Sequence, residues 1–153
     1  MIELSINDKA YRVEVQPGET LLEVLRGLGF KGVKKSCETG NCGACTVLLD
    51  SRPVASCILL AFQAEGRSIT TVEGLSQDHR LTAIQEAFIE ASAPQCGYCT
   101  PGMLLTTVAL LAQNPEPTRA EIREAISGNI CRCSGYVKIV DAIEQAARSL
   151  RLK

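Results

Sequence analysis

Eight cysteines constrain this 153-residue chain more than any other feature of its sequence. They fall into two sets of four on either side of a long stretch without cysteine: Cys37, Cys42, Cys45 and Cys57, then Cys96, Cys99, Cys131 and Cys133. Cytosolic thiols are kept reduced, so a cysteine pattern in a cytosolic protein more often means metal ligation than disulfide bonds. In that compartment the chain is expected to carry two metal centres, one in each half.

The compartment itself is inferred from the start of the chain. The segment MIELSINDKA has acidic residues where a signal peptide has its apolar stretch, and no run approaches the roughly 18 apolar residues of a membrane span. We therefore expect a cytoplasmic protein with no membrane span. Its 16 basic and 17 acidic residues leave no positive surplus to neutralise a phosphate backbone, which excludes nucleic acid as a partner.

The first cysteine set has the spacing of a plant-type [2Fe-2S] ferredoxin. Four residues separate Cys37 from Cys42, two separate Cys42 from Cys45, and Cys57 follows later. Gly40 and Gly43 allow the loop to bend and bring backbone N–H groups close to the sulfurs. The pair Cys42 and Cys45 alone would suit a tetrahedral zinc ion, but the entry from Cys37 favours the cluster.

The second cysteine set is ambiguous between zinc and an iron–sulfur cluster when it is considered alone. Thr100 can cap a helix that Pro101 opens immediately after Cys99, which would aim free N–H groups and a positive dipole end at the sulfurs. Ser134 and Gly135 can do the same after Cys133. An anionic cluster is therefore favoured at this site as well.

The pattern of apolar residues predicts an α+β protein. In the first half, alternation predicts a hairpin, a capping box begins a helix at Thr20, and Asp50-Ser51-Arg52-Pro53 forms a turn after the first of two more strands. The expected elements there are strands at 2–6, 11–15, 46–49 and 68–72 and a helix over 21–28, ended by Gly29. In the second half, helical periodicity predicts four helices at about 82–92, 101–113, 119–128 and 136–150. A capping box begins the third of them at Thr118, and Leu150 belongs to the apolar face of the last. The polar stretch 74–80 separates a domain at 1–74 from a domain at 75–153.

Taken together, the motifs resemble the small iron–sulfur subunit of the molybdenum hydroxylases, the family of xanthine dehydrogenase, aldehyde oxidoreductase and carbon monoxide dehydrogenase. The matching segments are Cys37-x4-Cys42-Gly-Ala-Cys45 with Cys57, Gln95-Cys96-Gly-Tyr-Cys99-Thr-Pro-Gly, and Gly128-Asn-Ile-Cys131-Arg-Cys133-Ser-Gly-Tyr136. They occur in the family's order, the resemblance covers nearly the whole chain, and no ligand position departs from the pattern.

The resemblance implies more than the spacing shows. It implies a ferredoxin-like β-grasp domain followed by a four-helix bundle, with one [2Fe-2S] cluster in each. It also implies a large subunit that carries a molybdenum-pterin cofactor near the second cluster and a medium subunit that carries FAD toward the first. By the same resemblance, Gln95 contacts the pterin through its side-chain amide, and the sulfur of Cys133 approaches it.

These expectations lead to one main functional hypothesis and two alternatives. The main one is an electron relay: a subunit without a catalytic site of its own, serving an oxidoreductase of N-heterocycles, aldehydes or carbon monoxide. A diffusible electron carrier is the first alternative, although helices that are apolar on most sides favour a permanent subunit. A structural zinc module is the second. The only histidine, His79, receives no role.

Overall fold

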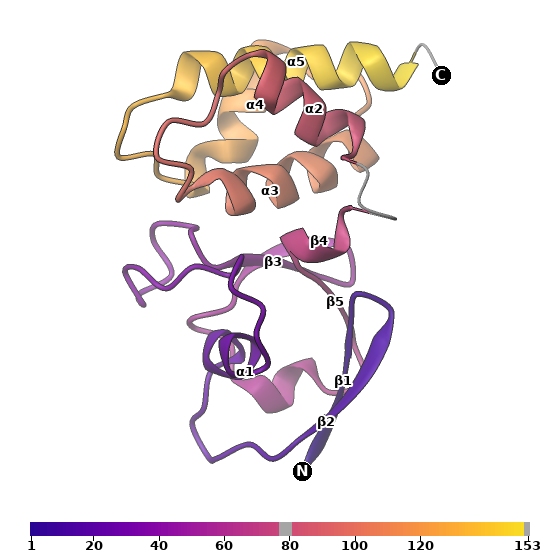
Figure 1. The fold of residues 1–153 in the computed structure, drawn as a ribbon, viewed down its shortest axis with the longest axis vertical. Coiled ribbons are helices and arrows are strands. Elements are labelled where there is room, and N and C mark those ends of the chain that lie inside the picture. Colours follow the sequence, from indigo (N-terminus) through magenta and orange to yellow (C-terminus); the bar gives the residue numbers. More distant parts are fainter. Residues whose placement is uncertain (77–80, 152–153) are drawn as a thin grey trace.

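The computed structural model describes residues 1–76 and 81–151, and the two halves of the chain lie one above the other (Figure 1). The N-terminal half contains a mixed five-stranded sheet with one α-helix, and the C-terminal half contains four α-helices. The predicted α+β class is confirmed. No helix within these described spans is long and apolar enough to cross a bilayer. His79 lies outside the described residues.

The sheet has the strand order β2-β1-β5-β3-β4. Strands β1 and β5 pair in parallel at its centre, and every other neighbouring pair is antiparallel. The strands are β1 (Ile2–Ile6), β2 (Lys9–Val13), β3 (Thr46–Leu49), β4 (Arg52–Ala55) and β5 (Ser68–Thr70). The last strand of the half thus inserts between the first and the third, a placement that requires contacts between distant parts of the sequence.

The first hairpin is confirmed, with one correction to its second strand. Asn7 and Asp8 both have positive φ, 50° and 63°, which is the two-residue turn that matches the twist of a hairpin. Because the turn needs only these two residues, β2 begins at Lys9 and not at residue 11, and it ends at Val13 and not at residue 15. Asn7 also holds the segment that follows β5, since its side chain bonds both the N–H and the hydroxyl of Thr71 at 2.9 Å.

Strand β4 was not predicted, because its sequence contains Pro53 and was interpreted as part of a turn. The turn is shorter: Asp50 and Ser51 carry positive φ of 48° and 65°, and pairing resumes with Leu49 opposite Arg52. Proline lacks an N–H and is tolerated where a strand lies at the edge of a sheet. Strand β4 is an edge strand, so Pro53 costs no hydrogen bond to a neighbour on its outer side.

Helix α1 (Leu21–Gly27) packs its apolar face into the sheet's core. Its capping box is present as predicted: the Thr20 hydroxyl accepts from the Glu23 N–H at 3.3 Å, and the Glu23 carboxylate accepts from the Thr20 N–H at 2.9 Å. The described residues also form three short 3-10 helices: η1 (Ala61–Ala64), η2 (Val72–Gly74) and η3 (Ile126–Gly128). The first two belong to the connections around β5.

The four predicted helices of the second half are confirmed as α2 (Ala83–Glu90), α3 (Thr100–Gln113), α4 (Arg119–Ala125) and α5 (Tyr136–Arg151). Helix α4 is shorter than predicted because its last turn tightens into η3. Contacts join α2 to α5, α5 to α4, α4 to α3 and α3 to α2 in a closed ring. Leu150, expected on the buried face of α5, is 46% exposed. The more detailed description as a four-helix bundle stays a prediction.

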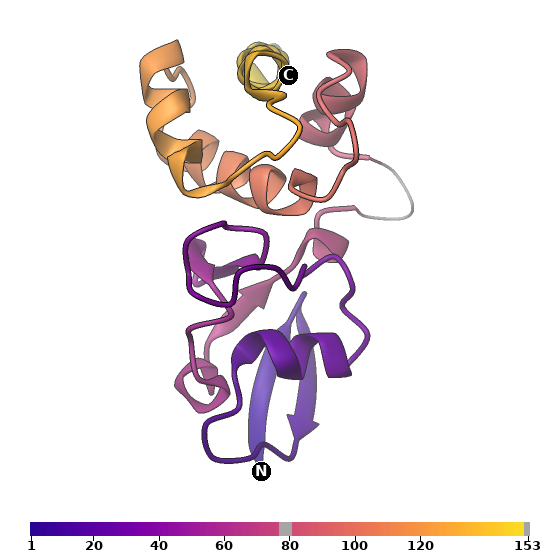
Figure 2. The same ribbon diagram turned by 90° about the vertical axis from the view of Figure 1, so that its left-hand side faces the viewer.

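Helix α3 is apolar on most sides because it is the helix of the C-terminal half that packs on the N-terminal half (Figure 2). One side packs in the helical core, and the other packs on β3, where Leu48 meets Leu105 and Ala109. Strand β3 is buried along its whole length for the same reason. The apolar surface of α3 is therefore covered within the chain, and it no longer argues for a permanent partner.

Candidate metal centres

The first four cysteines lie at one end of the β3–β4 hairpin. Cys45 directly precedes β3 and Cys57 comes two residues after β4, and since Thr46 pairs with Ala55, both cysteines lie at the same end of the ladder. Cys37 and Cys42 lie on the loop before β3. Positive φ at Glu38, Gly40 and Gly43 curls this loop back on itself, as expected for a segment that must point several sulfurs inward.

The polar contacts of these four thiols show that they face one another. The Cys37 sulfur accepts the N–H groups of Thr39 and Cys42, both at 3.4 Å, and the hydrogen bonds from these two residues lower the Cys37 pKa to about 6. Burial raises the Cys57 pKa to about 11, with further contributions from the neighbouring thiols of Cys45 and Cys37. The structure thus brings all four predicted residues into one cluster.

The second four cysteines come together from two loops of the helical half. Cys96 and Cys99 lie before α3, and Cys131 and Cys133 lie between η3 and α5. The thiol of Cys99 is within hydrogen-bonding reach of Cys131, and that of Cys96 is within reach of Cys133. Each contact joins one cysteine from the first loop to one from the second, so the four form a second cluster.

The second set differs from the first in its burial. Burial, followed by the nearby thiols of Cys131 and Cys96, raises the Cys99 pKa to about 12. Cys96 is exposed at the surface, and a backbone hydrogen bond from Tyr98 together with the side chain of Cys133 lowers its pKa. The site therefore has a buried side against the helical core and an open side at Cys96.

Both expected helix beginnings are present, and one of them differs in its cap. Helix α3 begins at Thr100 itself and Cys99 is its N-cap, so the expected capping by the Thr100 side chain is wrong. Helix α5 begins at Tyr136, and the N–H of Gly135 donates to the Cys131 sulfur at 3.4 Å. A thiolate at Cys99 would lie directly at the positive end of α3, which stabilises negative charge.

Among residues 1–76 and 81–151, no three His, Cys, Asp or Glu side chains converge as ligands of a single metal ion. The eight free cysteines are grouped in neighbouring pairs instead, four thiols to each site. A [2Fe-2S] cluster needs two thiolates on each of its two irons. The donor set at both sites therefore fits such a cluster in chemistry and in number.

The two cysteine loops are in direct contact with each other. The N–H of Ile130, next to Cys131, donates to the carbonyl oxygen of Cys42 at 2.8 Å. The Tyr98 hydroxyl, from the loop of Cys96 and Cys99, donates to the Lys35 carbonyl at 2.5 Å, and the Lys34 ammonium lies 5.9 Å from the centre of the Tyr98 ring. A backbone hydrogen bond thus connects Cys42 of the first site to Ile130, the neighbour of Cys131 in the second.

Gln95 is exposed, and its side-chain amide nitrogen donates to the carbonyl oxygen of Cys133 at 3.3 Å. This bond ties the loop before Cys96 to the loop after Cys131. Arg132, which lies between two cysteines, is exposed to solvent. The sequence alone predicts for Gln95 a hydrogen bond to nearby backbone, and the bond to Cys133 is of that kind. The contact with a pterin outside the chain is what the family resemblance implies, and it stays a prediction.

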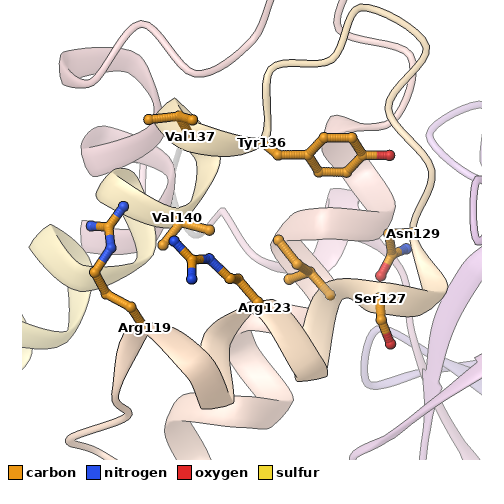
Figure 3. A pocket seen from close by; sticks show the side chains of 8 residues that line it. Arg119, Arg123, Ser127, Asn129, Tyr136, Val137 and Val140 are labelled. Atoms are coloured by element: carbon orange, nitrogen blue, oxygen red, sulfur yellow. The ribbon is translucent and has the colours of Figure 1, made fainter.

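Sequence-based reasoning assigned no role to three residues that support the second site: Thr106, Asn129 and Tyr136. The Tyr136 hydroxyl accepts the N–H of Cys131 at 2.8 Å, and Thr106 bonds the buried side chain of Asn129. Asn129 and Tyr136 also line a pocket of about 320 Å3 between α4 and α5, whose rim carries Arg119 (Figure 3). Asn129 and Tyr136 belong to the sequence motif around Cys131, and their place in that motif was the signal that could have identified them.

Comparisons with known proteins agree along the whole chain. Residues 4–70 match the model of a 2Fe-2S iron-sulfur cluster binding domain, and residues 71–144 match that of a [2Fe-2S] binding domain. The nicotinate dehydrogenase small FeS subunit of Eubacterium barkeri is 48% identical over 146 residues, 95% of this chain and 93% of that protein. The xanthine dehydrogenase iron-sulfur-binding subunit of Escherichia coli O157:H7 is 44% identical over 144 residues, 93% of this chain and 91% of that protein.

A solved structure shows the same fold. The match is to the crystal structure of quinoline 2-oxidoreductase from Pseudomonas putida 86, with a TM-score of 0.94 and 49% identity. It covers 99% of this chain and 95% of the matched chain.

Proposed function

The chain belongs to the family of [2Fe-2S] iron–sulfur subunits of molybdenum hydroxylase-type oxidoreductases, and from that premise we propose that it relays electrons between two partner subunits. In this proposal a large subunit carries the molybdenum-pterin cofactor and a medium subunit carries FAD. Electrons leave substrate on the large subunit, pass through a domain at 75–153 and then a domain at 1–74, and reach the flavin. The chain itself makes and breaks no substrate bonds.

We assign four cysteine ligands to each cluster. The first cluster takes Cys37, Cys42, Cys45 and Cys57, and the second takes Cys96, Cys99, Cys131 and Cys133. When bound, a [2Fe-2S] cluster accepts and releases a single electron without any change in its ligands. The chain supplies backbone N–H groups to the sulfurs, and such hydrogen bonds to ligands tune a cluster's reduction potential.

The observation that carries the proposal is the hydrogen bond from Ile130 N–H to the Cys42 carbonyl, 2.8 Å long. It joins the backbone of a ligand of the first site to the residue beside Cys131 of the second. A continuous path of covalent bonds and one short hydrogen bond couples two redox groups more strongly than a gap of the same length.

Gln95 is the residue we propose to contact the pterin of the large subunit. A side-chain amide has two N–H donors, and the bond to the Cys133 carbonyl uses one of them. The side chain is exposed at the open side of the second site, beside the exposed Cys96. This bond holds the amide in place and leaves its second N–H and its oxygen available to a partner on that side.

The proposal is tested on the full-length chain purified without oxygen. We expect about four irons and four sulfides per chain, visible absorption, and two distinct electron paramagnetic signals after dithionite reduction. Cys45→Ser should remove one signal and Cys99→Ser the other, each leaving about half of the iron. A colourless protein that contains zinc, or one variant that abolishes both signals while the fold is retained, contradicts the assignment.

Association with partners is a separate test, and it distinguishes the relay from a diffusible carrier. We expect the chain to co-purify from its native source with a large molybdenum-containing subunit and a flavin-containing subunit, in the cytoplasmic fraction. A chain that elutes alone and reduces several unrelated enzymes supports the carrier. Substrates of relatives named above, nicotinate and xanthine, are N-heterocycles, and we propose that class for the complex.

A further inference from the structure

Asn129 is a buried polar residue at the contact between the two halves of the chain. Its relative exposure is 4%, and it lies between η3 and the cysteine pair Cys131 and Cys133. Its side-chain nitrogen donates to the Gly43 carbonyl at 3.0 Å and to the Thr46 hydroxyl at 3.3 Å. Its side-chain oxygen accepts from the Thr106 hydroxyl at 2.8 Å. One side chain thus joins the first cysteine loop, helix α3 and the second cysteine loop.

The surroundings of Asn129 are shaped to let these three segments approach closely. A Cβ atom added to Gly43 would lie 2.2 Å from the Gly128 carbonyl oxygen and 2.5 Å from the Asn129 amide nitrogen. A Cβ atom added to Gly102 on α3 would lie 2.4 Å from the Gly43 carbonyl oxygen. The backbones are close enough that only glycine fits at both positions, so the amide sits in a tight polar junction.

We propose that Asn129 is a positioning residue that fixes the separation of the two cysteine loops. The inference rests on the proposed relay, because its consequence is the geometry between the two clusters. Asn129 directly precedes Ile130, whose N–H bonds the Cys42 carbonyl. Asn129 and Ile130 are thus consecutive residues, and the residues that they contact, Gly43 and Cys42, are consecutive as well. Loss of the amide contacts should therefore release the Ile130–Cys42 bond as well.

The chemistry of the junction requires an amide. The group must donate to a carbonyl and a hydroxyl on one side and accept from a hydroxyl on the other, and an asparagine side chain does both. A carboxylate at this position would place an oxygen against the Gly43 carbonyl and bury a charge without a counter-ion. Leaving such buried polar groups without partners is costly, so the loops would separate to admit water.

The test uses three variants of the full-length, cluster-loaded chain. Asn129→Asp keeps the shape of the side chain and removes its donors. Thr106→Val removes one hydroxyl bond to Asn129 and is the milder change. Thr107→Val is the matched control: Thr107 is also buried on α3, but its hydroxyl bonds only the carbonyl of Met103 within the same helix, at 2.7 Å.

Two measurements report on the separation of the loops independently of enzymatic turnover. Amide hydrogen exchange is followed in the segments 40–46 and 127–133, and the magnetic interaction between the two reduced clusters is followed by electron paramagnetic resonance. In Asn129→Asp and Thr106→Val we expect exchange in both segments to be about tenfold faster or more. The magnetic splitting should shrink, because the interaction weakens with the cube of distance. Thr107→Val should match the wild type in both.

Unchanged exchange and unchanged splitting in Asn129→Asp, with both clusters present, overturn the inference. If Asn129→Asp does not fold, Thr106→Val decides by the same two measurements against Thr107→Val. If the wild type contains no clusters, the relay fails, and the exchange comparison still decides whether Asn129 holds the loops together. Iron and sulfide content in every variant separates a failure of positioning from a failure of cluster binding.

Discussion

Gly43→Ala is the substitution that probes the contact between the two halves most directly. Gly43 lies between Cys42 and Cys45 with φ of +67°, a conformation that L-residues adopt at a cost. A Cβ atom added to Gly43 would also lie 2.2 Å from the Gly128 carbonyl oxygen. Neither neighbour is the flexible end of a long side chain, because the Gly128 oxygen is backbone and Asn129 is held by its own bonds.

The expected loss of stability has two parts. The left-handed conformation costs about 1–2 kcal/mol for a residue with a Cβ, and forcing an extra methyl group into a packed site costs about 1–3 kcal/mol more. Gly43→Ala should therefore destabilise the protein by about 2–5 kcal/mol. For a chain of about 150 residues this lowers the melting temperature by about 4–20 °C.

Two other glycines allow the conformational and the steric contributions to this loss to be measured separately. Gly66 has a nearly equal φ of +72° and open space around its position, so Gly66→Ala should cost only the conformational part, about 1–2 kcal/mol. Gly102 is helical and faces the Gly43 carbonyl at 2.4 Å, so Gly102→Ala tests the steric part, reduced by about 0.5–1 kcal/mol because alanine favours a helix.

The assay is thermal unfolding of the cluster-loaded chain without oxygen, followed by circular dichroism at one fixed scan rate. The scan rate must be constant because cluster loss makes unfolding irreversible, and apparent melting temperatures then depend on it. We expect the order wild type, Gly66→Ala, Gly43→Ala from most to least stable. A Gly43→Ala protein as stable as Gly66→Ala would refute the close contact between the first cysteine loop and Asn129.

Three further predictions concern the core, a helix cap and the metal. Phe88→Ala should lower the free energy of unfolding by about 3–5 kcal/mol in denaturant unfolding, because Phe88 is 2% exposed in the helical core. The control is Ile89→Ala next to it, which is 59% exposed and should change stability by about 0.5 kcal/mol or less. Equal effects would contradict the packing of α2. Thr82→Ala removes the hydroxyl that accepts the Gln85 N–H and should lower stability by about 1 kcal/mol. The measurement is a decrease in melting temperature of about 2–4 °C, and no decrease would mean that this cap contributes nothing. Chelation of the iron should unfold both halves, because ligand bonds supply stability that two small cores lack, and an apoprotein with the circular dichroism spectrum of the loaded chain would show the opposite.

Much of the local structure could be predicted because its causes lie within a few residues. The capping boxes at Thr20 and Thr118 join residues three apart, and both are present. The four helices of the second half follow from the spacing of apolar residues along each segment. The grouping of eight cysteines into two sets of four follows from ligand spacing, which a cluster-binding loop imposes on its own sequence.

Errors arose where a position depends on a distant neighbour. Strand β4 was missed because Pro53 argues against a strand unless the strand lies at an edge, and only the assembled sheet makes it one. The apolar surface of helix α3 predicts a partner subunit, because the sequence does not show that β3 covers its second face. In both cases the missing information was which element packs beside another.

The sequence by itself determined the metal chemistry, the class of fold and the family, because thiol spacing, helix caps and apolar periodicity are local properties. Only the tertiary structure decided that the two cysteine loops touch. The bonds that join them connect Tyr98 to Lys35, 63 residues apart, and Asn129 to Gly43, 86 residues apart. No local pattern encodes such contacts, since they form only when the packing of α3 on β3 has offset the entropy of closing so long a loop.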